Sequence, residues 1–201
     1  VIISSFPAPE VKAITLCQES EKLKTSFPLT AKKSTKGGFS ESDYELIWYK
    51  EDPKSNPSAE EFITIDLHLE DLSYDATTET EKDFKYWVVQ RYLGQGGGQS
   101  PAAELLVTIY SKPILKTKTP DPICLGGEVD LKDLYSISNR ITNQQYELEY
   151  LSSNGTNPKG SIATVHGEYQ CRAWFELSSG EICRSKFEDV FVTVNELEVA
   201  I

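Results

Sequence analysis

One pattern occurs twice in the chain, and it constrains the fold more than any other feature. In residues 167–194, apolar side chains recur at every second position on both sides of a Ser178-Ser179-Gly180 turn, which is typical of a β-hairpin with one buried face. Residues 85–109 repeat this layout around Gly96-Gly97-Gly98. The residues predicted to face inward in the later copy are Tyr169, Cys171, Ala173, Phe175, Val190, Val192 and Val194. Tyr86 corresponds to Tyr169, Ser100 to Ser185 and Val107 to Val192, which predicts two modules of one fold.

The 201 residues are enough for two modules that each bury a core, and the repeat divides them into residues 1–111 and 112–201. Short strand-like runs between turn signals, with no long helical period, predict about seven strands in each module. We therefore predict an all-β chain of two tandem immunoglobulin-like β-sandwich modules. Trp48 is predicted at the centre of the first core, on the third strand. Residues 111–122 contain three prolines and are predicted to be a short, semi-rigid linker.

The charge of the chain excludes two classes of partner. The formal net charge is −11, whereas nucleic acids and anionic membranes both require clustered Lys and Arg. We therefore expect no nucleic-acid partner. No apolar run approaches the length of a membrane span, so we also expect no direct insertion into a membrane.

Few residues in the chain could support catalysis or hold a metal. His166 lies five residues before Cys171, but the strand alternation points Cys171 into the core, where a thiol behaves as a small apolar group. The chain has two histidines and no Cys-x-x-Cys motif, so neither a zinc site nor an enzyme is expected. An acidic cluster leaves calcium open as a cofactor, although its spacing is not that of an EF-hand. Its members are Asp66, Glu70, Asp71 and Asp75.

Three aromatic residues are predicted on outward faces of the sheets: Trp87, Trp174 and Phe191. Outward aromatics on one sheet could form a contact with a neighbouring module, or a binding patch for a protein or a surface polysaccharide. The alternative is that neighbouring loops or long side chains cover them. The sequence leaves the two interpretations open.

Four cysteines favour an oxidising compartment, with one in the first half and three in the second: Cys17, Cys124, Cys171 and Cys183. This distribution allows one bridge within the second module, and buried free thiols are the alternative. Immunoglobulin topology would place Cys124 and Cys183 at opposite ends of a sandwich, too far apart to bond. It therefore favours Cys171 as the partner of Cys124.

A succession of short motifs resembles the Ig-like repeats of Bacteroidetes cell-surface and gliding-motility adhesins. The motifs are Cys-Leu-Gly-Gly-Glu-Val-Asp-Leu at 124–131, Trp48-Tyr49, Tyr-Trp-Val-Val-Gln at 86–90 and Cys-Arg-Ser at 183–185. The resemblance implies a bridge between Cys124 and Cys183, because these two match the cysteines of the repeat. Gly98 stands at the second cysteine position of the first module, which leaves Cys17 without a partner there.

The resemblance also implies a function. It predicts a non-enzymatic spacer segment of a long, repetitive adhesin at the cell surface, acting in adhesion or gliding motility, with neighbouring repeat modules as its partners. The alternative is a carbohydrate- or protein-binding module attached to a secreted enzyme or a surface receptor. Loss of glycan binding on replacement of Trp87 or Trp174 would favour this alternative.

Overall fold

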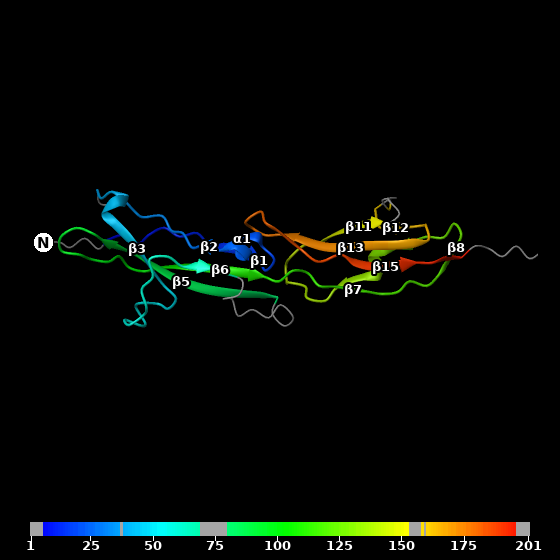
Figure 1. Ribbon diagram of the computed structural model, residues 1–201, viewed down its shortest axis with the longest axis horizontal. Coiled ribbons are helices and arrows are strands. Elements are labelled where there is room, and N and C mark those ends of the chain that lie inside the picture. Colours follow the sequence, from blue (N-terminus) through cyan, green and yellow to red (C-terminus); the bar gives the residue numbers. More distant parts are fainter. Residues whose placement is uncertain (1–5, 37, 69–79, 153–157, 159, 196–201) are drawn as a thin grey trace, which may run out of the picture. The chain divides into compact units, whose positions relative to one another are not determined.

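The computed structural model describes residues 6–36, 38–68, 80–152, 158 and 160–195 of the chain (Figure 1). The chain forms two compact units, residues 1–75 with 81–110, and residues 76–80 with 111–201. Their regular secondary structure is almost entirely β-strand, which confirms the predicted fold class. The predicted division at residues 111 and 112 implies that each half folds alone, and this stays a prediction.

The first module is built on a four-stranded sheet in the order β1-β6-β5-β3. Strand β1 runs parallel to β6, and the other neighbours are antiparallel. Figure 1 shows the two longest strands of this module, β5 and β6, side by side. A second pair, β2 and β4, lies outside this sheet. The elements are β1 (Ile14–Cys17), α1 (Glu21–Thr25), β2 (Phe27–Pro28), η1 (Glu41–Asp43), β3 (Tyr44–Tyr49), β4 (Asp66–Leu67), β5 (Glu81–Tyr92) and β6 (Ala103–Tyr110).

The core of the first module lies on one face of this sheet. Trp48 is 2% exposed and packs there, as predicted. Alternate residues of β5 and β6 supply much of the rest, because side chains on a strand point to opposite faces in turn. The other buried members are Leu16, Leu23, Leu29, Ile65, Leu67, Tyr86, Val88, Leu105, Val107 and Ile109.

The opposite face of the same sheet is also buried over part of its area. Ile47, Tyr49 and Val89 form a second small cluster there, with Trp87 and other partly buried residues packed against it. Residues 50–62 follow β3, and their Ala59 packs against the cluster. The first module therefore buries both faces of β3.

The second module contains one larger sheet and several short pairs. Strand β13 is the centre of the larger sheet, with β11 on one side and β14 and β15 on the other. The elements are β7 (Leu115–Thr117), β8 (Ile123–Cys124), β9 (Val129–Asp130), η3 (Leu131–Leu134), β10 (Tyr135–Ile137), β11 (Glu147–Ser152), β12 (Ile162–Ala163), β13 (Gly167–Glu176), β14 (Ile182–Arg184), β15 (Glu188–Val192) and β16 (Val194–Asn195).

The predicted alternation is confirmed in β13 and β15. All four predicted inward residues of β13 are buried, as are Val190 and Val192 on β15, while Val194 is partly buried. The hydroxyl of Tyr169 donates to the carbonyl of Val165, at 2.9 Å. This bond reaches back four residues from the start of the strand, as in the tyrosine corner of immunoglobulin-like folds.

The proline-rich stretch 111–122 is more than a linker. Its Leu115–Thr117 segment is strand β7, which pairs with β10. Leu115 is buried in the core of the second module. The prolines at 113, 120 and 122 lie outside β7, so they leave its ladder of hydrogen bonds intact.

The two modules repeat each other down to single hydrogen bonds. In the first, the hydroxyl of Ser100 accepts from the N–H of Gln90 at 3.0 Å and donates to the next carbonyl. In the second, the hydroxyl of Ser185 accepts from the N–H of Ala173 at 2.9 Å and likewise donates to the next carbonyl. The correspondence of Ser100 with Ser185, predicted from the sequence, is therefore confirmed.

Candidate functional site

Residues 50–62, which follow β3, are bound to the sheet by an ion pair. The guanidinium of Arg91 donates to both carboxylate oxygens of Glu61, at 2.5 and 2.6 Å. Tyr49 donates its hydroxyl to the same carboxylate at 3.1 Å. The Arg91 hydrogen bond holds the pKa of Glu61 below its usual value, whereas burial is the main cause that raises the pKa of Tyr49. The network positions residues 50–62 over the second face of β3.

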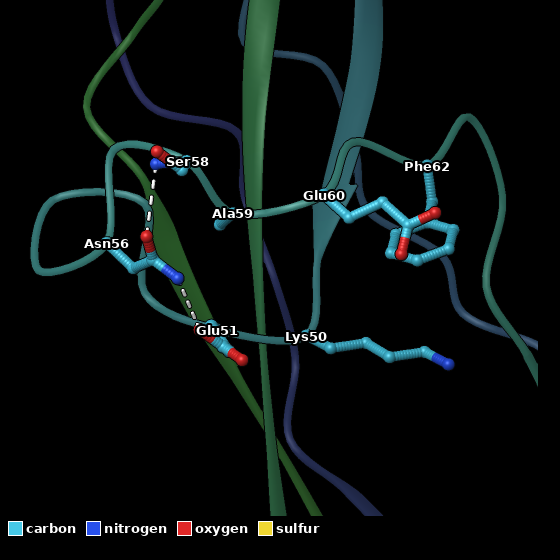
Figure 2. A pocket seen from close by; sticks show the side chains of 7 residues that line it. All are labelled: Lys50, Glu51, Asn56, Ser58, Ala59, Glu60 and Phe62. Atoms are coloured by element: carbon cyan, nitrogen blue, oxygen red, sulfur yellow. Dashed lines mark hydrogen bonds between the residues drawn. The ribbon is translucent and has the colours of Figure 1, made fainter.

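A pocket of about 330 Å³ lies within this segment (Figure 2). Its polar groups largely bond one another: the amide of Asn56 donates to Glu51 at 2.6 Å and accepts from the N–H of Ser58 at 3.1 Å. The ammonium of Lys50 lies 5.2 Å from the centre of the Phe62 ring. Figure 2 shows Lys50, Glu60 and Phe62 on the side away from Asn56. Two carboxylates, Glu51 and Glu60, line the pocket, and the first of them accepts the hydrogen bond from Asn56.

A second pocket, of about 550 Å³, lies beside Trp87. Trp87 is half-buried rather than exposed, because it packs against the cluster of Ile47, Tyr49 and Val89. At the rim, the carboxylate of Glu104 pairs with Lys85 at 2.8 Å, and Asp52 accepts from the N–H of Lys54 and the hydroxyl of Ser55. Because Trp87 is partly covered and also lines this pocket, both interpretations of this residue stay open.

The two outward aromatics of the second module do not form one patch. Phe191 is 53% exposed and meets the ring of His166 edge-on, with centroids 5.0 Å apart. It lies opposite Glu168 on β13, whereas Trp174 lies six residues further along that strand. Six residues of strand span about 20 Å, too far for one ligand ring to touch both. Trp174 is partly buried.

The cysteines are arranged differently from the predicted bridge. Cys17 and Cys183 are disulfide-bonded, whereas Cys124 is a free, exposed thiol and Cys171 is a free, buried one. The bridge between Cys124 and Cys183 that the resemblance implied is therefore wrong, and so is the alternative with Cys171. The buried free thiol at Cys171 is confirmed.

The strand register explains why Cys124 and Cys183 cannot bond within one module. Cys183 lies opposite Phe175, near the end of β13, whereas Cys124 lies opposite Asn195, beyond the start of that strand. Val192, three residues before Asn195, lies opposite Gly167 at the start of β13. From Gly167 to Phe175 the strand extends about 26 Å, which is the approximate separation of the two cysteines along it. A disulfide requires Cα atoms within about 7 Å. The opposite-ends argument from immunoglobulin topology was therefore sound.

Cys171 is completely buried in the core of the second module. Burial raises the pKa of its thiol to about 12, so the reactive thiolate is scarce at neutral pH. His166 accepts from the N–H of Val194 at 3.3 Å and packs against Phe191. Cys171 therefore lies in the core, whereas His166 contacts an exposed aromatic ring.

This difference between the thiols gives a direct prediction. In the folded chain at pH 8, we expect iodoacetamide to alkylate Cys124 at least about 100-fold faster than Cys171, because Cys124 is exposed whereas Cys171 is completely buried. Peptide mass spectrometry after timed quenching measures both rates, and the same reaction in urea is the control, where the two rates should converge. Equal rates in the folded chain would contradict the burial of Cys171.

Among the residues that the structure describes, no group of three or more His, Cys, Asp or Glu side chains could hold a metal ion. Of the acidic residues considered for calcium, the structure describes only Asp66, whose side chain is exposed. Glu70, Asp71 and Asp75 lie outside the described residues, so calcium stays an untested expectation. Over the described ranges, no helix has both the length and the apolar character needed to cross a membrane.

Comparison with known proteins finds similar solved structures but no matching protein family. No protein-family model and no curated protein sequence matches the chain. Extracellular domains 3–5 of Drosophila OTK match at 14% identity and a TM-score of 0.38, over 94% of this chain and 60% of that one. The fibronectin(III)-like modules of Clostridium thermocellum CbhA match at 12% identity and a TM-score of 0.35, over 98% and 95%. Domains FN1–FN3 of chicken CNTN1 match at 12% identity and a TM-score of 0.30, over 93% and 67%.

Proposed function

We propose that this chain is a pair of consecutive, non-catalytic spacer modules from a longer multi-module protein of the cell surface. The observation that carries the proposal is the repetition of one sandwich with the same local hydrogen bonds, such as those of Ser100 and Ser185. A module that is copied with its core intact serves by its length and its position in an array.

Two further observations support this proposal. The disulfide-bonded state of Cys17 and Cys183 fits the oxidising conditions outside the cell. The net charge of −11 would make neighbouring modules repel one another and keep a crowded array soluble and extended. A role in adhesion or gliding motility rests on the resemblance alone and is part of the proposal.

The parent gene and the intact cell test this function. We expect the open reading frame to encode further modules with the same alternating hairpin. We also expect antibodies raised against residues 1–201 to label unpermeabilised cells. A frame that holds only these two modules beside a catalytic domain, or labelling that requires permeabilisation, would contradict the proposal.

The pocket beside Trp87 is the observation that favours a ligand-binding alternative. Its volume of about 550 Å³ is within the range of small-molecule sites, and an aromatic ring lines it. If it binds a glycan, Trp87→Ala should weaken binding on a glycan array at least about tenfold, the effect of losing one stacking contact. Trp174→Ala is the matched control, because Trp174 lies in the other module. If the unmodified chain binds no glycan, the ligand-binding alternative is contradicted and the spacer function remains the proposal.

A further inference from the structure

Trp87 belongs to a row of side chains that crosses one face of the sheet in the first module. Its register partners on the neighbouring strands are Tyr49 on β3 and Glu104 on β6. Residues that pair directly across antiparallel strands carry their side chains close together on the same face. The row therefore places the carboxylate of Glu104 beside the indole ring of Trp87.

A second carboxylate reaches the same pocket from the loop that follows β3. Asp52 lines the pocket of about 550 Å³ together with Trp87 and Glu104. Its Oδ1 atom accepts from the N–H of Lys54 at 2.9 Å, and its Oδ2 atom accepts from the hydroxyl of Ser55 at 2.8 Å. The bond from Lys54 and then that from Ser55 hold the pKa of Asp52 below its usual value, so the group is charged at neutral pH. Two carboxylates from separate elements therefore line the pocket.

The walls between these charges are apolar. Pro53, Pro101 and Ala102 line the pocket with Trp87, and so does Val89, which is buried. The indole ring packs against the small cluster on the second face of β3, which holds it in position while part of its surface stays accessible. A group that enters the pocket therefore meets an aromatic ring, apolar walls and two negative charges.

The lining offers more acceptors for a cation than donors for a sugar or an anion. Among the described residues that line the pocket, Lys54 is the only basic one, against the carboxylates of Asp52 and Glu104. The hydroxyl of Ser100 already donates to the carbonyl of Pro101 at 2.9 Å. A cation, by contrast, is attracted both by the face of an indole ring and by nearby carboxylates. The lining is therefore suited to a positively charged group.

An existing ion pair leaves this site open to a ligand. The ammonium of Lys85 lies 2.8 Å from the carboxylate of Glu104, but both side chains are about half exposed. Water and salt screen an ion pair at such a surface, so it contributes little to stability. A cation that binds against Trp87 can therefore take the place of Lys85 at Glu104.

We propose that the pocket beside Trp87 binds an arginine side chain from a basic segment of a partner protein. The guanidinium stacks on the indole ring and donates to Asp52 and Glu104, while its aliphatic stem contacts the prolines. Arginine suits the site better than lysine, because its planar and weakly hydrated group stacks on aromatic faces. The net charge of −11 attracts a basic partner from a distance. This inference goes beyond the spacer function and does not depend on it.

Short peptides tested on the whole chain examine the proposal. The probe is an acetylated and amidated glycine-arginine-glycine peptide, and its matched control carries citrulline, which has the shape of arginine without the charge. The readout is the indole N–H signal of Trp87 in heteronuclear NMR spectra, assigned with Trp87→Phe. The indole signals of Trp48 and Trp174 show that the fold is intact. We expect the Trp87 signal to shift and saturate with a dissociation constant on the order of 1 mM, and the citrulline peptide to bind at least about tenfold more weakly.

Variants of the two carboxylates locate the binding. Asp52→Asn together with Glu104→Gln should weaken binding of the arginine peptide at least about tenfold. Asp121→Asn together with Glu128→Gln is the matched control, because it removes two charges from exposed positions of the second module and should change binding by less than about twofold. An unmoved Trp87 signal, equal binding of the citrulline peptide or an equal loss in both double variants would overturn the inference. A Trp87 signal that shifts with methyl glucoside and not with the arginine peptide would overturn it in favour of the glycan alternative.

Discussion

Replacing Trp48 with alanine is expected to lower the free energy of unfolding of the first module by about 3–5 kcal/mol, the usual cost of truncating an aromatic residue in a core. Trp48 is 2% exposed and packs among the residues of the main cluster. The neighbouring strands hold that cluster in place, so they can fill the cavity only in part.

Hydrogen exchange at increasing urea concentrations measures this loss, read separately on peptides from each module because two modules need not unfold together. Leu93→Ala is the matched control, since Leu93 is 61% exposed and its truncation should change stability by less than about 0.5 kcal/mol. A loss below about 1 kcal/mol for Trp48→Ala would place this residue outside the core.

Replacing Gln90 with leucine is expected to cost about 2–4 kcal/mol, although leucine is the more apolar residue. Gln90 is completely buried, and its side chain bonds both backbone groups of Ser34: it accepts from the N–H at 2.9 Å and donates to the carbonyl at 3.0 Å. Ser34 is buried as well, so its two backbone groups would have no water to replace the amide.

The same exchange experiment measures this effect, with protection expected to fall first around Ser34. Gln170→Leu is the matched control, because the amide of Gln170 bonds Asp189 on an exposed surface. A change below about 1 kcal/mol at Gln90 would mean that the backbone of Ser34 finds other partners.

The strands of the hairpins could be predicted because their alternation is local. The cover over the second face of β3 was missed, although the sequence carried a signal for it. Ile47, Trp48 and Tyr49 are consecutive apolar residues, and a strand that is apolar at every position is buried on both faces. The same signal accounts for Trp87, which faces outward and is nevertheless half-buried.

The bonding state of the cysteines could not be predicted from local sequence patterns. Motif matching compared cysteines within one repeat and pointed to Cys124, whereas the disulfide-bonded cysteines are Cys17 and Cys183. The argument that Cys124 and Cys183 lie at opposite ends of a sandwich was correct and excluded the bridge. The sequence also does not show that Cys183 lies beside Ser111, which is 72 residues away in the chain. The hydrogen bonds between Gln90 and Ser34 could not be predicted either, because the two residues are 56 positions apart in the chain.

Separate expression of the two halves tests most directly the claim that this chain is one self-sufficient module built twice. Residues 1–110 with Cys17→Ser, and residues 111–201 with Cys183→Ser, remove the bonded pair without leaving a new thiol. We predict that each half gives a β-sheet circular-dichroism spectrum and a dispersed amide NMR spectrum on its own. Unfolded spectra for each half, beside a folded spectrum of the intact chain with both substitutions, would contradict the account.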